Sequence, residues 1–169
     1  VYGYDDTISF SSESLFAIQI SGDINDRMTA TGQLVSRGAD DYDVDFEWAY
    51  LTFEATDNLS ISAGRLRLPL FRYSASSDIG YSYHWVNAPR SVYDVAFTNI
   101  EGIRFDYSDY AGDWEYTLQA VVGNYENDLA GGRLIGDNTY LGSAEFTYES
   151  LKFRAVYGAN KATYTRADL

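Results

Sequence analysis

The residues Ile61–Tyr93 read ISAGRLRLPLFRYSASSDIGYSYHWVNAPRSVY, and this stretch decides the fold. Its first part alternates polar and apolar residues as a β-strand does, with Arg65 and Arg67 on one face and leucines on the other. Pro69 lacks the N–H that a strand ladder needs, so we expect the strand to end there. The sequence therefore predicts a strand that leads directly into a long connection.

The connection after Pro69 continues to Tyr93 and is rich in aromatic residues, namely Phe71, Tyr73, Tyr81, Tyr83, Trp85 and Tyr93. Loops longer than about 12–15 residues are uncommon in compact domains, and such loops are usually functional or disordered. A disordered tether contains few aromatic residues. We therefore expect residues 69–93 to form a loop that folds against the rest of the chain.

The composition of the 169-residue chain favours strands, because it includes 16 Tyr, 9 Phe and 3 Trp. The absence of Cys excludes disulfides and thiolate metal sites. No run of about 18 apolar residues occurs, so no transmembrane helix is expected. The formal net charge of −13 argues against binding to nucleic acid, since phosphate contacts need a basic surface.

Alternation of apolar and polar residues predicts eight strands of about 8–11 residues each. In most of them one face is apolar and aromatic, while the other carries Arg, Lys, Glu, Gln and Thr. The third strand mixes both kinds of residue on each face, so the pattern does not assign its sides. The expected strands are Leu15–Ser21, Arg27–Ser36, Val44–Ala55, Leu59–Leu68, Ile100–Tyr107, Trp114–Gly123, Tyr140–Tyr148 and Leu151–Gly158.

The connections between these strands alternate in length. Short turns are expected at Gly22–Asp26, Thr56–Asn58, Ser108–Asp113 and Glu149–Ser150, and longer acidic loops at Arg37–Asp43, Pro69–Tyr93 and Asn124–Asp137. Transmembrane barrels have short turns at one rim, long loops at the other, and apolar residues on the outside. The sequence therefore predicts an all-β protein, a transmembrane antiparallel up-and-down β-barrel, with residues 1–169 as a single barrel segment.

Two parts of the chain carry a family resemblance. The first reads GRLRLPLFRYS (Gly64–Ser74) and continues with DIGYSYHWV (Asp78–Val86), and the second reads QISGDINDRMTATGQLVSRGADDYDVDFEWAYLTF (Gln19–Phe53). Over most of Ser12–Gly158, the chain resembles the general porins of Gram-negative outer membranes, which are sixteen-stranded and typically trimeric. The resemblance implies a multi-pass protein of the bacterial outer membrane, surrounded by lipid and lipopolysaccharide. It further implies a homotrimer without cofactor that lets small hydrophilic solutes or ions diffuse passively.

In that family, the loop after the arginine-bearing strand folds into the lumen and forms the constriction. The resemblance places residues 69–93 there, with the arginines of the preceding strand on the facing wall. The candidate constriction residues are Arg65, Arg67, Arg72, Asp78 and Arg104. A second interpretation remains open, in which the arginines, together with Lys152 and Arg154, pair with carboxylates of the wall. For Lys152 and Arg154 we favour this second interpretation.

The loop aromatics Tyr73, Tyr81, Tyr83 and Trp85 have two compatible interpretations. They form a surface along which sugars or aromatic solutes slide, or they pack the loop onto the barrel wall through their large buried area. The sequence does not distinguish these roles.

The length of the chain differs from that of the family. A full porin is about twice as long and ends on an aromatic-terminated strand, whereas NKATYTRADL (Asn160–Leu169) reads as the start of another loop. Eight strands enclose a bore just wide enough for side chains, which leaves no room for the loop 69–93. We therefore expect about half of a larger barrel.

Two other functions compete with a channel. One is a non-conducting structural or adhesive barrel whose loops bind partners. The other is a lipase-like barrel enzyme that uses His84, the single histidine, with Asp78 and Ser82 nearby in sequence. No nucleophile elbow precedes a helix, so we expect no enzyme and no catalytic residues.

The aspartates Asp40, Asp41, Asp43 and Asp45 lie close together in one loop region. Divalent cations prefer several oxygen ligands, but the glycine and terminal glutamate of an EF-hand are missing. We therefore interpret this cluster as a solvated loop and expect no metal site.

Overall fold

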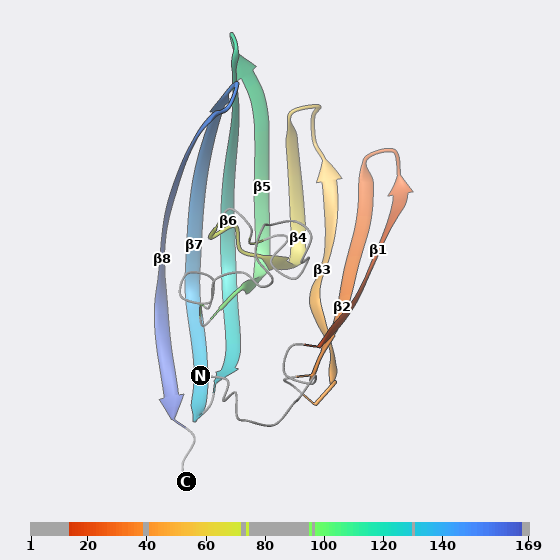
Figure 1. Ribbon diagram of the computed structural model, residues 1–169, viewed down its shortest axis with the longest axis vertical. Coiled ribbons are helices and arrows are strands. Elements are labelled where there is room, and N and C mark those ends of the chain that lie inside the picture. Colours follow the sequence, from red (N-terminus) through yellow and green to blue (C-terminus); the bar gives the residue numbers. More distant parts are fainter. Residues whose placement is uncertain are drawn as a thin grey trace.

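A computed structural model describes residues 14–38, 41–71, 74, 95, 97–129 and 131–166. These residues form eight β-strands, which Figure 1 shows side by side in sequence order. The strands are β1 (Leu15–Asn25), β2 (Met28–Arg37), β3 (Val44–Glu54), β4 (Leu59–Arg67), β5 (Asn99–Ala111), β6 (Trp114–Leu129), β7 (Gly132–Tyr148) and β8 (Leu151–Arg166).

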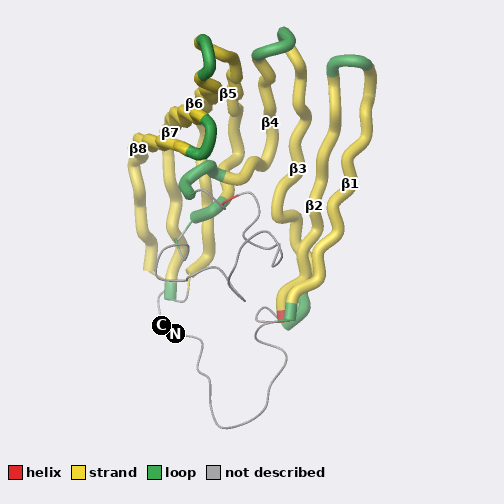
Figure 2. The backbone as a smooth tube through the Cα atoms, turned by 45° about the horizontal axis from the view of Figure 1, so that its top comes forward, coloured by secondary structure: helices red, strands yellow, loops and turns green. Residues whose placement is uncertain are grey.

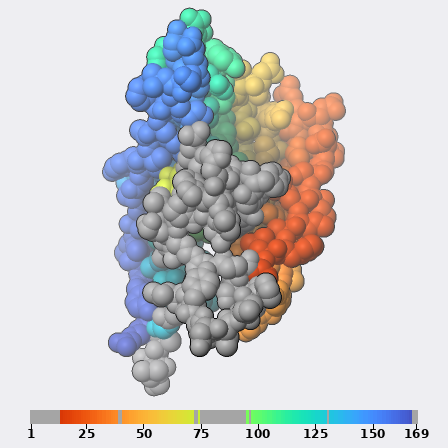
Figure 3. Space-filling view, in the orientation of Figure 1, coloured from red at the N-terminus to blue at the C-terminus, as the bar shows by residue number. Residues whose placement is uncertain are grey.

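All eight strands belong to one sheet, and each is antiparallel to its neighbour in sequence. The prediction of an all-β, up-and-down antiparallel fold is therefore confirmed. The sheet of the described residues is not closed into a barrel, because β1 and β8 are its two edges. Figure 2 shows these edges on opposite sides of the sheet, and Figure 3 shows β8 in blue and β1 in orange-red flanking the molecule.

Short turns at 26–27, 55–58, 112–113 and 149–150 gather at one end of the sheet, at the top of Figure 1. We call this the turn end, and the opposite end the loop end. Gly112 has a φ of 65°, and Glu149 has a φ of 49°. Such left-handed conformations allow the abrupt reversal of a hairpin and are easiest for glycine.

The prediction of a long loop at Asn124–Asp137 is wrong. In the structure β6 continues to Leu129 and β7 starts at Gly132, so the two strands extend by a further hairpin. Asn, Asp and Gly are typical of loops, and this composition hid the pairing. Across the hairpin Arg133 forms ion pairs with Glu126 and with Asp128, and the buried ring of Tyr125 stacks on Phe97 with 4.3 Å between ring centres.

Other strand ends also extend past their predicted limits. The strand β8 continues to Arg166 through residues that we expected to start a loop, and it reaches 16 residues. The strand β1 continues to Asn25 through most of the predicted turn Gly22–Asp26. These extensions are rich in polar residues, and their backbone groups pair with a neighbouring strand, which hydrophobic alternation alone does not reveal.

The sheet has two faces that differ in polarity. We call one the outer face, and it contains the hydrogen-bonded row Leu51, Ala63, Ile103, Val122 and Tyr140. We call the other the inner face, and it contains the adjacent row Thr52, Ser62, Arg104, Val121 and Leu141. Large apolar side chains are exposed on the outer face, whereas charged and amide side chains occupy much of the inner face.

The inner face also carries a small apolar core near the start of the long connection. Its members are Leu66, Leu68, Ile100, Val121 and Leu141, with Tyr50, Leu70 and Phe97 packed against them. Two leucines that alternate with the arginines of β4 are thus 0% and 1% exposed. Burying a leucine side chain stabilises a fold by about 1.5–3 kcal/mol. This core therefore fixes the beginning of the connection, Leu68–Leu70, against the inner face.

Three glycines from adjacent strands meet on the inner face, because Gly64 pairs with Gly102 and Gly102 pairs with Gly123. A Cβ on Gly102 would lie 2.1 Å from the carbonyl oxygen of Val122. Real Cβ atoms do not approach an oxygen so closely, so the backbones here are packed too tightly for any side chain.

Candidate functional site

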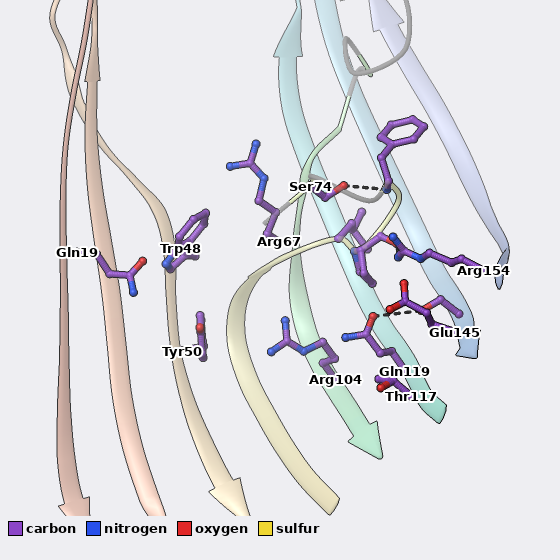
Figure 4. A pocket seen from close by; sticks show the side chains of 14 residues that line it. Gln19, Trp48, Tyr50, Arg67, Ser74, Arg104, Thr117, Gln119, Glu145 and Arg154 are labelled. Atoms are coloured by element: carbon purple, nitrogen blue, oxygen red, sulfur yellow. Dashed lines mark hydrogen bonds between the residues drawn. The ribbon is translucent and has the colours of Figure 1, made fainter. Parts of the chain in front are cut away.

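A cavity of about 450 Å³ lies on the inner face, and strands from both halves of the sheet contribute to its lining (Figure 4). Its lining has three guanidinium groups, one carboxylate, three aromatic rings, several uncharged polar groups and two further loop residues. These are Arg67, Arg104 and Arg154; Glu145; Trp48, Tyr50 and Phe71; Gln19, Ser74, Thr117, Gln119 and Ser143; and Leu68 and Pro69. In a chain with a net charge of −13, the excess of cations at this site is distinctive.

Arg67 lies at the end of β4, where the chain turns onto the inner face. Its guanidinium carbon is 5.6 Å from the centre of the Trp48 ring. Its Nη1 is 3.0 Å from Oε1 of Glu47, and its side chain is only 12% exposed. A cation over an indole face is attracted by the ring quadrupole, so the aromatic ring and the carboxylate together fix the guanidinium.

Arg104 belongs to a hydrogen-bond network across β5, β6 and β7. Its Nε donates to Oδ2 of Asp106 at 2.7 Å, and its guanidinium carbon lies 5.8 Å from the Tyr50 ring centre. Gln119 Nε2 donates to the other carboxylate oxygen of Asp106 at 2.7 Å, and Ser143 Oγ donates to Gln119 Oε1 at 3.1 Å. Figure 4 draws this last bond as a dashed line. Because each member restrains the next, the wall of the cavity is rigid here.

Arg154 joins the wall to the start of the long connection. Its Nη2 donates to the backbone oxygen of Pro69 at 2.6 Å. On the same strand, Lys152 Nζ is 2.6 Å from Oε1 of Glu145. Among the described residues, Arg154 has no carboxylate within ion-pair distance, whereas Arg67 and Arg104 each have one.

The predicted constriction residues do not all lie at the cavity. Arg67 and Arg104 line the cavity, and Arg65 does not. Arg65 pairs in the ladder with Ala49 and Glu101, and its Nη2 is 3.9 Å from Oδ2 of Asp45. The remaining candidates lie outside the described residues, and they are Arg72, Asp78, Tyr73, Tyr81, Tyr83 and Trp85, together with His84.

Several cavity residues were not predicted, and the β-bulge in β3 explains part of this. Gln33 pairs with Trp48, but the next residue of β2, Leu34, pairs with Phe46, which leaves Glu47 as an extra residue. An extra residue reverses the alternation that follows it, so neither face of Val44–Ala55 appeared uniform. Arg154 was interpreted as part of a wall ion pair, whereas its contact is with a backbone carbonyl.

In the part of the chain that the structure describes, no group of three or more His, Asp or Glu side chains is arranged to hold a metal ion. Within the same ranges, no helix has the length and apolar character needed to cross a membrane. Comparisons of this chain with protein-family models, with curated proteins and with solved structures found no match.

Proposed function

We propose that this sheet forms part of an outer-membrane porin, a water-filled barrel through which small hydrophilic solutes or ions diffuse passively. One observation carries the proposal: a single sheet exposes large apolar side chains on one face and has a charged cavity on the other. Transmembrane barrels have this arrangement, with lipid outside and a polar lumen inside. The porin resemblance of Gly64–Ser74 and Gln19–Phe53 implies the same function.

The outer face is too apolar for a sheet that meets water. Phe16 is 67% exposed, Ile20 is 68% exposed and Phe153 is 56% exposed. The same face also exposes Ile18, Phe46, Leu51, Ile103, Phe105, Leu118, Val122, Phe146 and Leu151. Extended apolar surfaces of this kind mark contact with a membrane or a partner.

The position of this apolar surface along the strands supports a tilted, barrel-like arrangement. Successive cross-strand partners lead from Tyr157 on β8 through Gly142, Ala120, Phe105, Ile61, Phe53 and Met28 to Asn25 on β1. On β8 this row meets the apolar run, since Tyr157 is the residue of that run nearest the loop end. On β1 the same row has already reached the turn end at Asn25, whereas the apolar run of β1 is Phe16–Ile20.

The apolar belt is thus displaced by about ten residues between β8 and β1. With about 3.4 Å per residue along a strand and about 4.8 Å between strands, the strands are inclined to the belt by about 45°. Transmembrane strands are tilted by about 35–45° from the barrel axis, so this inclination supports a belt that runs parallel to a membrane plane.

Aromatic residues cluster on the outer face near the turn end. The Trp114 and Tyr148 rings are 5.1 Å apart, Tyr116 and Phe146 are 6.4 Å apart, and Tyr107 lies 6.0 Å from Tyr116. Rings of this kind prefer the boundary between hydrocarbon and lipid headgroups. They define one limit of the proposed membrane span.

The open edges β1 and β8 require a partner in this setting. Unpaired backbone groups are too costly in hydrocarbon, so only closed barrels span membranes with strands. We propose that further strands close the sheet into a barrel of about sixteen strands and that three barrels form a homotrimer, as the porin resemblance implies. The cavity then lies in the lumen, where Pro69, Phe71 and Ser74 contribute to its lining.

In a lumen, the cavity arginines act on passing solutes. Charges in a narrow passage with protein walls interact more strongly than charges in bulk water. Arg67, Arg104 and Arg154 line the cavity together with Glu145, and the aromatic rings restrict its width. The site therefore selects solutes by size and charge without a binding pocket that encloses them.

Conductance across a planar lipid bilayer tests the proposal. The closed barrel, with the strands that complete the sheet, is expected to insert and to give stepwise increases in current, and heat-denatured protein is the control. Correctly folded protein that inserts but gives no current steps would favour the non-conducting barrel and contradict the channel.

A further inference from the structure

We propose that Glu47 is the positioning residue of Arg67 and that it cancels the charge of this arginine in the lumen. The inference rests on the proposed channel function, and it assigns the control of charge selectivity to a residue that no alternation pattern singles out.

The local backbone gives Glu47 its unusual place. It is the extra residue of the bulge in β3, between Trp48, which pairs with Gln33, and Phe46, which pairs with Leu34. A bulge re-aims a side chain that regular pleating would direct elsewhere. The carboxylate of Glu47 reaches the inner face as a result, and its side chain is 7% exposed.

The contacts of Glu47 join three other strands. Its Oε2 accepts a hydrogen bond from Arg37 Nη2 of β2 at 2.8 Å. Its Oε1 lies 3.0 Å from Arg67 Nη1 of β4, and it accepts a longer bond of 3.4 Å from Asn99 Nδ2 of β5. One buried carboxylate thus fixes two guanidinium groups from opposite sides.

These contacts also orient Arg67 in the cavity. The carboxylate holds one side of the guanidinium, and the Trp48 ring lies 5.6 Å from its central carbon. Removing the carboxylate of a buried ion pair leaves the charge of its cation uncompensated by that partner. Without Glu47, we therefore expect the guanidinium of Arg67 to lose this restraint and to attract anions more strongly.

The variants Glu47→Gln and Arg67→Gln change the charge in opposite directions with little change in size. Reversal potentials in a KCl gradient, measured on reconstituted full chains, report the ratio of chloride to potassium permeability. Glu47→Gln is expected to raise this ratio by about two-fold or more, because a unit charge within a few ångströms of the ion path is uncovered. Arg67→Gln is expected to lower the ratio, and the double variant to return it toward the wild-type value.

Asp45→Asn provides a matched control. It removes the same charge from the same strand two residues away, but its side chain is 76% exposed and its Arg65 contact is 3.9 Å long. We expect a smaller shift from this variant. SDS gel electrophoresis of unheated samples shows whether each variant stays folded. This comparison separates selectivity changes from loss of folding.

A Glu47→Gln shift no larger than that of Asp45→Asn would overturn the inference while leaving the channel intact. An effect of Glu47→Gln that is as large in the Arg67→Gln background as in the wild type would show that Glu47 does not position Arg67. If the wild-type protein itself gave no conductance, the proposed channel function would be contradicted instead.

Discussion

Arg154 on β8 donates a hydrogen bond of 2.6 Å to the backbone oxygen of Pro69, which precedes it by 85 residues in the chain. The bond connects the wall of the sheet to the point where the long connection leaves β4. It also leaves the positive charge of Arg154 without a carboxylate partner among the described residues. Arg154 therefore combines an anchoring contact with a charge that has no carboxylate at ion-pair distance among the described residues, although Glu145 lies opposite it on β7.

This arrangement predicts an order among the cavity arginines. Arg154→Gln is expected to shift ion preference toward cations more than Arg104→Gln does, because Asp106 already compensates Arg104 at 2.7 Å. We expect a change of about two-fold in the permeability ratio, as for one unit charge near the ion path. Reversal potentials under a salt gradient provide the measurement. An effect of Arg104→Gln equal to that of Arg154→Gln would show that pairing does not control selectivity here.

The two faces of β6 predict opposite tolerance to charge. Leu118 is 41% exposed on the outer face, whereas the neighbouring Thr117 lines the cavity. Leu118→Arg is expected to destabilise the membrane-inserted state by about 2–4 kcal/mol, as Arg does near the midplane of a bilayer. Thr117→Arg is expected to destabilise this state less, because the introduced guanidinium enters a polar space. Urea titrations of protein folded into liposomes compare the two, and equal costs would mean that the faces are assigned incorrectly.

The sequence was sufficient for the strand order because hydrophobic alternation is local. Val121, Gln119 and Thr117 alternate with Ala120 and Leu118, and the structure places the first three on the inner face. Period-two patterns persist wherever a strand is regular and its two faces meet different surroundings. This information identified all eight strands.

The same reasoning failed where pairing depends on partners distant in sequence. Arg65 and Arg67 alternate as predicted, yet only Arg67 lines the cavity, because the chain turns onto the inner face at the end of β4. The bulge at Glu47 reversed the pattern of β3. The contact between Arg154 and Pro69 depends on how eight strands are arranged in space, and no spacing in the chain encodes it locally.

Close backbone contact predicts a strong effect of one added methyl group. In Gly102→Ala, the new Cβ would lie 2.1 Å from the Val122 oxygen and 2.8 Å from the Gly123 Cα, so β5 and β6 must separate. We expect a loss of about 1–3 kcal/mol, which is typical of overpacking. Gly32→Ala is the control, since no atom lies within 4 Å of the position that its new Cβ would take. Midpoints of urea unfolding measure both, and equal midpoints would show that the strands are not closely packed at Gly102.

The separation of turns and loops at opposite ends of the sheet predicts a sidedness in the membrane. The chain has no Cys, so a single introduced thiol reports one position. Asp43 lies between β2 and β3 at the loop end, and Asp57 lies between β3 and β4 at the turn end, and both are exposed. In transmembrane barrels of the outer membrane, the long loops face the exterior and the short turns face the periplasm. A membrane-impermeant maleimide applied to intact cells is therefore expected to label Asp43→Cys and to label Asp57→Cys only after the outer membrane is permeabilised. Labelling of both variants on intact cells would place the two ends in the same compartment, and a sheet that does not cross the membrane would be the remaining explanation.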